Sequence, residues 1–148
     1  GNKIWESITD GIDVIVYVES DLIWAQHTIN ELIRQVADKR NEYVVMFPMV
    51  FLDRTGYKAK TFYDTWAFRA DGINFTHDYP YHEILVDEEY FADDTTIDID
   101  SGGSCFALKG NLKNLIKFDK DLVVGMCNQL RDRGNLVWLD TALSVVHE

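Results

Sequence analysis

The stretch Val14-Ile15-Val16-Tyr17-Val18-Glu19-Ser20-Asp21-Leu22-Ile23-Trp24 decides how the rest of the sequence is interpreted. Its first half is a continuous apolar, largely β-branched run, which is typical of a central strand buried on both faces of a parallel or mostly parallel sheet. The run ends in two carboxylates, Glu19 and Asp21, one residue apart. Because ligands of such sheets bind beyond the carboxyl ends of the strands, we expect both side chains in a functional site.

This acid-x-acid pair is a candidate metal site. Two hard oxygen donors so close together suit Mg²⁺ or Mn²⁺ better than Zn²⁺. The alternative interpretation is that Asp21 caps the following helix and that Glu19 is solvated. A short motif of this kind matches many unrelated sequences, so the rest of the chain has to decide between the two.

The composition is that of a single globular domain. The chain has 148 residues, of which 47% are hydrophobic and 13% aromatic, enough for a sizeable core. Its formal net charge is -11, which argues against binding to a nucleic-acid backbone, because such binding rests on Lys and Arg. A divalent cation would still allow an acidic protein to bind a nucleotide.

Neither the cysteines nor the apolar segments indicate an extracellular or a membrane protein. Cys105 and Cys127 have no metal-ligand spacing and form no disulfide framework. No run approaches the roughly 18 apolar residues of a membrane span, and no signal-peptide pattern is present. We therefore expect a soluble protein of the cytoplasm, a reducing compartment.

The spacing of apolar residues predicts alternating strands and helices. Strands are expected over 13–18, 43–52, 61–69, 98–109 with a break at 101–104, and 136–139. Helices are expected at the end of 2–10 and over 25–39, 111–116 and 122–133. Residues 142–148 are short and extended, and the acidic, aromatic segment 71–96 is typical of a binding loop. This order predicts an α/β fold with a mixed, mostly parallel central sheet flanked by helices.

His147 follows an apolar run, as the acidic pair does. If the two strand ends lie side by side, its imidazole joins Glu19 and Asp21 on one divalent ion. The alternative is a surface histidine at a frayed chain end. Two further histidines, His77 and His82, lie in the acidic, aromatic segment without metal-type spacing, and we expect them to be solvated.

The segment 62–69, Phe-Tyr-Asp-Thr-Trp-Ala-Phe-Arg, has the composition of a sugar site. Such a site needs stacking surfaces and a few placed polar groups. Alternation predicts that Phe62, Asp64, Trp66 and Phe68 share one face, so a core strand would explain the aromatic residues equally well. It would not explain Asp64, because a buried carboxylate is costly without a partner.

Two glycines and three aspartates are further candidates for the site. Gly102 and Gly103, at a strand break, either let a ligand approach the backbone or form a β-bulge. Asp119 and Asp121 precede a predicted helix, so either is a candidate general base, while Asp121 is also a plausible N-cap. Asp140, at the end of a predicted strand, has the same ambiguity.

Together these features resemble the catalytic and C-terminal part of metal-dependent glycosyltransferases of the GT-A fold. The pair in Glu19-Ser20-Asp21 is similar to the family's DxD motif, and Gly102-Gly103 to a later glycine segment. The third point of similarity is the tail, where a helix ending at 127–134 is followed by the Trp-containing strand 137–140 and then by His147. Residues 62–66 also resemble those of fungal capsule-type mannosyltransferases, which suggests a viral or microbial member.

The resemblance implies a Rossmann-related GT-A fold and transfer of a sugar from a nucleotide-sugar donor to a glycan acceptor. A UDP-sugar is the favoured donor and GDP-mannose the second. Asp21, His147 and, through water, Glu19 would hold Mn²⁺ or Mg²⁺ on the donor diphosphate, where the ion neutralises charge on the leaving nucleotide. GT-A domains begin with a β-α-β portion that is not in this sequence, so the single domain 1–148 is expected to be N-terminally incomplete.

The resemblance also implies roles for further residues. Contacts with donor or acceptor are expected from Glu19, Trp66, Arg69, Gly102 and Gly103. The candidate catalytic carboxylates are Asp121, Asp119 and Asp64. Two other functions stay open: a non-catalytic carbohydrate-binding or interaction domain, and a nucleotidyltransferase or phosphohydrolase, since paired carboxylates with a divalent ion also serve phosphoryl chemistry.

Overall fold

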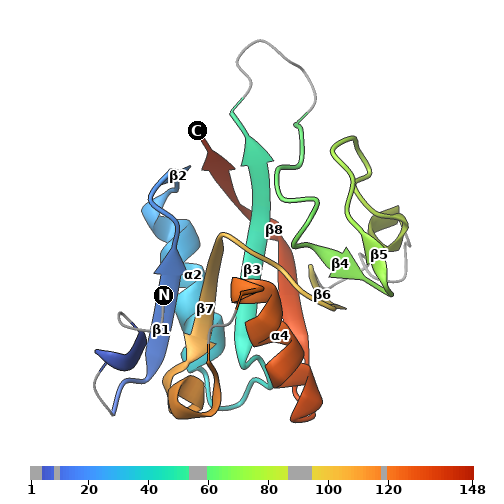
Figure 1. The fold of residues 1–148 in the computed structure, drawn as a ribbon. Helices are drawn as coiled ribbons and strands as arrows, with labels where there is room; N and C mark the ends of the chain where they lie inside the picture. Colours follow the sequence, from blue (N-terminus) through green and yellow to red (C-terminus); the bar gives the residue numbers. More distant parts are fainter. Residues whose placement is uncertain (1–4, 9–10, 54–59, 87–94, 118–119) are drawn as a thin grey trace.

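The computed structural model describes residues 5–8, 11–53, 60–86, 95–117 and 120–148. These residues form a mixed α/β fold, in which one twisted sheet has helix α2 (Gln26–Ala37) against one face and helix α4 (Leu122–Asp132) against the other (Figure 1). The strand order of the sheet is β1-β7-β3-β8-β2, and β6 also pairs with β8. The strands are β1 (Val14–Val18), β2 (Leu22–Ile23), β3 (Val45–Leu52), β6 (Thr96–Ile99), β7 (Cys105–Lys109) and β8 (Val137–His147).

The sheet is mixed, as predicted, but it is not mostly parallel. Among the described strands only β3 and β8 pair in parallel, whereas β1 with β7, β3 with β7, β2 with β8 and β6 with β8 are antiparallel. The expected central strand, β1, is the last strand of the order at one end, and Ile15 is its only buried residue. A run of apolar residues indicates burial, but it carries no information about the direction of the neighbouring strands.

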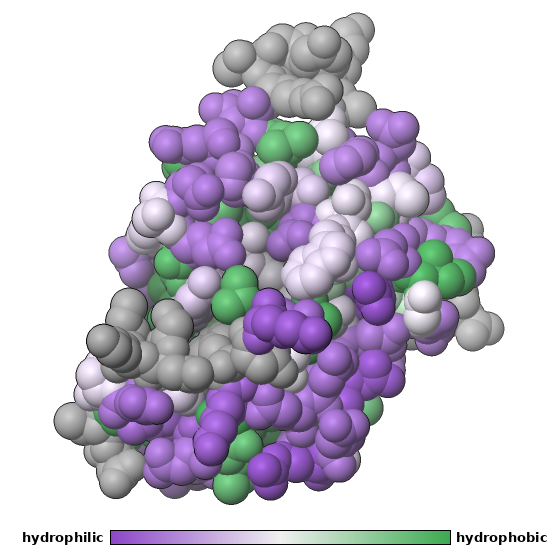
Figure 2. All heavy atoms as spheres, viewed as in Figure 1, coloured by the Kyte–Doolittle hydropathy of each residue, from purple (hydrophilic) through white to green (hydrophobic). Residues whose placement is uncertain are grey.

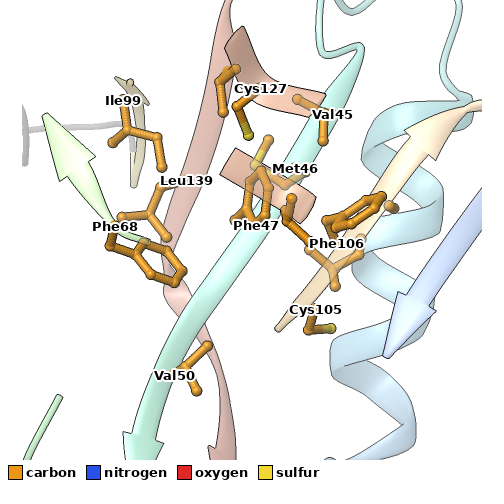
Figure 3. Close-up of a cluster of buried hydrophobic side chains, with 14 of the residues drawn as sticks. Val45, Met46, Phe47, Val50, Phe68, Ile99, Cys105, Phe106, Cys127 and Leu139 are labelled. Atoms are coloured by element: carbon orange, nitrogen blue, oxygen red, sulfur yellow. The ribbon is translucent and has the colours of Figure 1, made fainter. Parts of the chain in front are cut away.

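The core is centred on β3, in which residues 45–51 are all buried. On one face, Phe47 packs against Phe68 and Phe106, with ring centroids 6.0 and 5.5 Å apart (Figure 3). Helix α2 covers the opposite face with a stripe of buried side chains at helical spacing: Ile29, Leu32 and Val36. The predicted strand 43–52 and the predicted helices 25–39 and 122–133 are therefore confirmed, with slightly shorter ends.

The strand predicted over 61–69 is not formed. Phe62 makes an isolated bridge, and the chain then turns, because Asp64 Oδ1 accepts a hydrogen bond from the Ala67 N–H at 3.1 Å. As a result Phe62 is fully buried while Trp66 is 59% exposed, so the aromatic side chains do not share one face. An Asp side chain that binds a nearby backbone N–H competes with strand pairing, which the alternation of apolar residues does not reveal.

The predicted strand 136–139 and the extended tail join into one long strand, β8. Its register with β3 shifts in the middle, where Asp140 pairs with Pro48 but Ser144 pairs with Met49. The extra residues bend β8. Its last residues thereby reach β2, and His147 pairs with Leu22.

The segment after Asp64 contains short elements. They are β4 (Arg69–Ala70), β5 (Ile73–Asn74) and the 3₁₀ helix η1 (Glu83–Val86), and a second 3₁₀ helix, η2 (Gly110–Leu115), stands where a helix was predicted. The expectation that His82 is solvated is wrong, since it is only 5% exposed. Its Nδ1 accepts the Ile84 N–H at 3.0 Å, and its Nε2 lies 3.0 Å from the Ala70 carbonyl oxygen.

The surface shown in Figure 2 is mainly hydrophilic, with hydrophobic side chains scattered over it. Within the described ranges, no helix combines the length and the apolar character that a membrane span requires.

Candidate functional site at the corner between β1 and β2

The site begins where the chain turns from β1 into β2. The Glu19 N–H donates to the Ser104 carbonyl oxygen at 3.0 Å, which continues the pairing of β1 with β7 by one residue. The Leu22 N–H donates to the Glu19 carbonyl oxygen at 3.2 Å and closes the turn. The Glu148 N–H donates to the Asp21 carbonyl oxygen at 3.0 Å. The acid-x-acid pair is therefore held between the start of β7 and the end of β8.

The end of β8 lies beside β2 (Figure 1), and this pairing brings His147 against Asp21, although the two residues are far apart in the sequence. His147 Nε2 lies 2.8 Å from Asp21 Oδ2. The imidazole is stacked on the ring of Tyr63, with centroids 3.9 Å apart and an interplanar angle of 18°. Its other nitrogen, Nδ1, is buried and has no hydrogen-bond partner among the described residues. The ring is thus held by stacking on one side and by a carboxylate at its tip.

Asp64 brings a third carboxylate to the same place. Its Oδ1 accepts the Ala67 N–H, and its Oδ2 lies 3.3 Å from the Ser104 hydroxyl, which donates to it. The charge of Asp64 raises the pKa of Glu19, and His147 lowers the pKa of both carboxyl groups. Four segments distant in sequence therefore form one electrostatically coupled cluster.

Burial and mutual repulsion set the proton affinity of this cluster. Desolvation is the main cause that raises the pKa of Glu19, and the charges of Asp21 and Asp64 raise it further. Desolvation also raises the pKa of Asp64, against the hydrogen bonds from Ala67 and Ser104. A divalent cation in contact with these groups would remove the repulsion between them.

The backbone at Ser104 is strained. Ser104 has a φ of 69°, a region that residues other than glycine rarely adopt, and the Cys105 N–H donates to the Gly103 carbonyl oxygen at 2.8 Å across it. Ser104 is also buried, at 2% exposure. Strain of this kind costs on the order of 1–3 kcal/mol and gathers at functional sites. Here it directs a hydroxyl toward a carboxylate.

The donor atoms fit part of a metal ligand shell. In the part of the chain that the structure describes, no group of three or more His, Cys, Asp and Glu side chains is arranged to hold a metal ion by itself. The pair formed by Asp21 and His147 has a suitable separation, because neighbouring ligands of an octahedral ion lie about 3 Å apart when each is about 2.1 Å from the metal. The Asp21 side chain is 51% exposed, so water or a bound ligand can supply the other positions.

Packing within the protein explains why residues 102 and 103 are glycines. A Cβ at position 102 would lie 2.6 Å from Cδ1 of Phe47, and a Cβ at position 103 would lie 2.6 Å from Oδ2 of Asp64. The space beside Gly103 is therefore filled by a side chain of the cluster itself.

The remaining predicted residues lie in different places. Trp66 is exposed two residues beyond Asp64, and Arg69 is an exposed residue of β4 whose N–H donates to the Ser101 carbonyl oxygen at 3.2 Å. Asp121 is the N-cap residue of α4, without a side-chain capping bond, and it is not among the groups that shift the pKa of Glu19 or Asp64. Asp119 lies outside the described residues.

Asp140, a candidate base by its position at a strand end, is buried and occupied by structural bonds. Its Oδ2 accepts a hydrogen bond from Gln35 Nε2 at 2.8 Å, and its Oδ1 accepts one from the Thr95 hydroxyl at 2.6 Å. These bonds join β8 to α2 and to the residue before β6.

Sequence reasoning missed Tyr63, Ser104 and Tyr17 as parts of this cluster. Tyr17 lies close enough to Glu19 and Asp21 for their charges to raise its pKa, although burial is the larger cause. Each of the three is an ordinary residue type within two residues of a candidate site residue. Only the three-dimensional structure shows that these residues belong to the cluster.

Comparisons of the sequence with protein-family models and with curated proteins gave no significant match. A functional assignment for this chain therefore depends on the geometry and chemistry of the cluster formed by Glu19, Asp21, Asp64 and His147.

Proposed function

We propose that this chain is a metal-dependent glycosyltransferase that moves a sugar from a nucleotide-sugar donor to a glycan acceptor. A UDP-sugar is the favoured donor and GDP-mannose the second. The observation that supports this most directly is the 2.8 Å approach of His147 Nε2 to Asp21 Oδ2 beside two further carboxylates. An acidic cluster would repel a diphosphate on its own, so a nucleotide-sugar function requires a cation at this place.

Asp21 and His147 would hold Mn²⁺ or Mg²⁺ directly, and Glu19 would do so through water. Once bound, the ion would neutralise charge on the diphosphate and on the leaving nucleotide. Tyr63 keeps the His147 ring in one orientation by stacking on it. Hydrogen-bonded partners that orient a ligating histidine typically change metal affinity or activity by 10–100-fold, and we expect a stacked ring to act in the same direction.

Asp64 is the candidate general base of this enzyme. Burial raises the pKa of its carboxyl group, which brings it closer to the range in which a base works best near neutral pH. The hydrogen bonds from Ala67 and Ser104 fix its position. Trp66, exposed and close in the chain, is the stacking surface for donor or acceptor sugar.

Mn²⁺ binding tests the metal site. Spin-resonance titration with and without UDP would compare the natural chain with Asp21→Asn and His147→Gln, and with Asp98→Asn as a control that removes an exposed carboxylate of β6. We expect UDP to strengthen Mn²⁺ binding, and each site variant to weaken it at least tenfold while the control does not. The proposal would be contradicted if the natural chain did not bind Mn²⁺, or if both Asp21→Asn and His147→Gln bound Mn²⁺ as tightly as the natural chain.

Release of UDP or GDP from a panel of nucleotide sugars tests the reaction. Turnover that requires Mn²⁺ or Mg²⁺ and disappears in Asp21→Asn supports glycosyl transfer. Release of phosphate or pyrophosphate without sugar transfer would instead indicate phosphoryl chemistry.

A non-catalytic carbohydrate-binding domain is the second candidate. Exposed aromatic rings favour it, because Trp66 is 59% and Tyr79 76% exposed. This function predicts glycan binding that persists in excess EDTA and is lost in Trp66→Ala or Tyr79→Ala. Metal-dependent transfer would exclude it.

A further inference from the structure

Strand β1 ends the main sheet on one side. In the strand order β1-β7-β3-β8-β2 it has one neighbour, β7, and no described strand lies on its other side (Figure 1). Among the described residues before β1, Trp5 is held elsewhere, because its Nε1 donates to the Lys113 carbonyl oxygen at 3.0 Å. Edge strands of this kind pair readily with another extended chain.

The register with β7 shows which backbone groups of β1 face outward. The Gly110 N–H donates to the Asp13 carbonyl oxygen at 2.9 Å, and the Glu19 N–H donates to the Ser104 carbonyl oxygen at 3.0 Å. Hydrogen-bonded pairs alternate along an antiparallel ladder, so the odd-numbered residues from 13 to 19 bond to β7. The N–H and C=O groups that point away from β7 belong to three residues: Val14, Val16 and Val18.

Strand β1 lacks the features that normally protect an edge. Native edge strands are blunted by Pro, by charged side chains, by bulges or by being very short. The five residues of β1 are Val-Ile-Val-Tyr-Val, and their register with β7 is continuous, whereas β2 at the other end of the order has only two residues. The outward-facing groups have no hydrogen-bond partner among the described residues. The edge of β1 can therefore accept a further strand.

A carboxylate stands at each end of β1 on the same face of the sheet. Asp13 is exposed and Glu19 is half-buried, and because they are six residues apart their side chains point to the same side. Lys109 lies on the other face, since it pairs with Val14, and its Nζ donates to the Val36 carbonyl oxygen at 2.7 Å. The edge thus presents an apolar strand between two acidic groups, in a chain of formal net charge -11.

We propose that this edge binds an extended segment of a basic partner protein, which adds a strand antiparallel to β1. The backbone groups of Val14, Val16 and Val18 would supply the hydrogen bonds, as when a peptide extends a sheet. Residues directly opposite each other share one face, so basic side chains six positions apart in the segment would lie opposite Asp13 and Glu19. The residues between them would be largely β-branched, opposite the apolar residues of β1.

The charges favour such a segment over a second copy of this chain. If two copies paired antiparallel with Val16 opposite Val16, Asp13 of each copy would lie opposite Glu19 of the other. Like charges directly opposite each other destabilise a sheet. Registers shifted from this one would leave part of β1 unpaired.

This docking site goes beyond the proposed transferase function and does not need it. The binding experiments contain excess EDTA, so a cation at the carboxylate cluster cannot compete for Glu19. A failed metal site and a failed docking site are therefore distinguishable.

Amide hydrogen exchange of the natural chain tests the edge itself. We expect the N–H groups of Val14, Val16 and Val18 to exchange at least tenfold faster than those of Ile15 and Tyr17, which bond to β7. This pattern should not depend on protein concentration. Slow exchange of all five would show an edge that is already covered, and protection that grows with concentration would show a second copy as the occupant. Either result would overturn the proposal.

Peptide binding tests the partner. The probe is the capped peptide Lys-Val-Thr-Val-Thr-Val-Lys, and its saturable binding should slow the exchange of Val14, Val16 and Val18. At constant ionic strength, Glu-Val-Thr-Val-Thr-Val-Glu should bind at least tenfold more weakly. Lys-Lys-Val-Thr-Val-Thr-Val has the same composition without the spacing, and it should bind at least threefold more weakly. Equal affinity of the probe and either control, or binding that leaves the exchange unchanged, would overturn the proposal.

The key variant is Asp13→Lys, because the Asp13 side chain is exposed and its backbone bond to β7 is kept. It should weaken binding of the lysine probe at least fivefold and strengthen binding of the glutamate peptide, with little change in melting temperature. Asp98→Lys is the matched control, which makes the same change in charge at an exposed residue of β6. Val16→Pro removes an outward N–H without removing a bond to β7, and it should abolish binding. Undiminished binding in Asp13→Lys would overturn the proposal.

Discussion

Gly103 makes room for the Asp64 carboxylate, since a Cβ at position 103 would lie 2.6 Å from Asp64 Oδ2 and 2.8 Å from the Ala67 Cβ. Separations that short do not occur between real side chains, so the carboxylate can lie beside Ser104 only because residue 103 has no side chain. One glycine thereby determines the position of the most deeply placed acid of the cluster.

Gly103→Ala should therefore shift Asp64 and reduce stability. Overpacking of this kind typically costs about 1–3 kcal/mol, measurable by urea unfolding. Gly102→Ala is the matched variant, because its Cβ would overlap the Phe47 ring in the core instead. Both variants should be destabilised, but only Gly103→Ala should also weaken Mn²⁺ binding. Equal Mn²⁺ affinity in the two variants would refute the link between Gly103 and the site.

The positive φ of Ser104 predicts an inverted order of two substitutions. Ala is normally more stable than Gly in a folded chain, because Gly loses more backbone freedom. At a φ of 69°, however, Ala keeps the strain and Gly relieves it. Ser104→Gly should therefore be more stable than Ser104→Ala by about 1 kcal/mol in chemical denaturation. The ordinary order, with Ala the more stable, would show that the turn is not strained.

The raised pKa values of Glu19 and Asp64 predict a dependence of stability on pH. Because both groups bind protons more tightly in the folded chain, their contribution to stability falls as pH rises above their ordinary values of 4.5 and 3.8 and through the raised pKa values. In thermal unfolding, metal-free Asp64→Asn should lose less stability than the natural chain as the pH rises from about 4, near the ordinary pKa of Asp64, to 7. Mn²⁺ should restore stability at pH 7 in the natural chain. Parallel pH profiles would contradict this assignment.

His82 is expected to fix the segment around β4 and β5. His82→Phe keeps a buried ring but removes the acceptor of the Ile84 N–H and the partner of the Ala70 carbonyl oxygen. Unpaired buried polar groups cost about 1–3 kcal/mol each, so we expect a loss of about 3 kcal/mol. Limited proteolysis should then cleave this segment first. His77→Phe is the control with the smaller expected loss, because His77 is exposed and its ring makes one backbone hydrogen bond, to the Phe62 carbonyl oxygen.

The sequence predicted the elements with strong periodicity and missed those determined by side-chain bonds to backbone. The spacing of apolar residues is sufficient to predict helix α2 and strand β3. The apolar stripe of α2 and the apolar run of β3 are buried whatever their neighbours are. The turn at Asp64 depends on one carboxylate accepting the Ala67 N–H, which no periodic pattern signals. The direction of the neighbouring strands could not be predicted from the sequence either, because β3 is buried to the same extent whether its neighbours are parallel or antiparallel.

For the candidate site, the sequence identified acidic residues but not what surrounds them. Proximity of His147 to Asp21 was expected if two strand ends met, and the pairing of Leu22 with His147 is how they meet. The bend of β8 that makes this pairing possible comes from a shift in register, and its residues carry no distinctive signal. Ser104 was outside the prediction for a similar reason, because its role depends on a backbone conformation.

The stack of Tyr63 on His147 leads to a prediction about metal affinity. With Nε2 directed at Asp21 and Nδ1 without a partner among the described residues, the orientation of the ring depends on this stack. Tyr63→Phe keeps the aromatic face, so its Mn²⁺ affinity should stay within about twofold of the natural chain. Tyr63→Ala removes the face, and its affinity should fall about tenfold, as is typical when the support of a ligand ring is lost.

Tyr63→Leu separates stacking from simple packing, because it fills much of the space without a flat ring. If stacking orients the imidazole, Leu should behave like Ala in the Mn²⁺ titration while its melting temperature lies closer to that of the Phe variant. If Leu instead binds Mn²⁺ as Phe does, bulk alone would be sufficient at position 63. The His147 ring would then be positioned by the pairing of β8 with β2 and not by its aromatic neighbour.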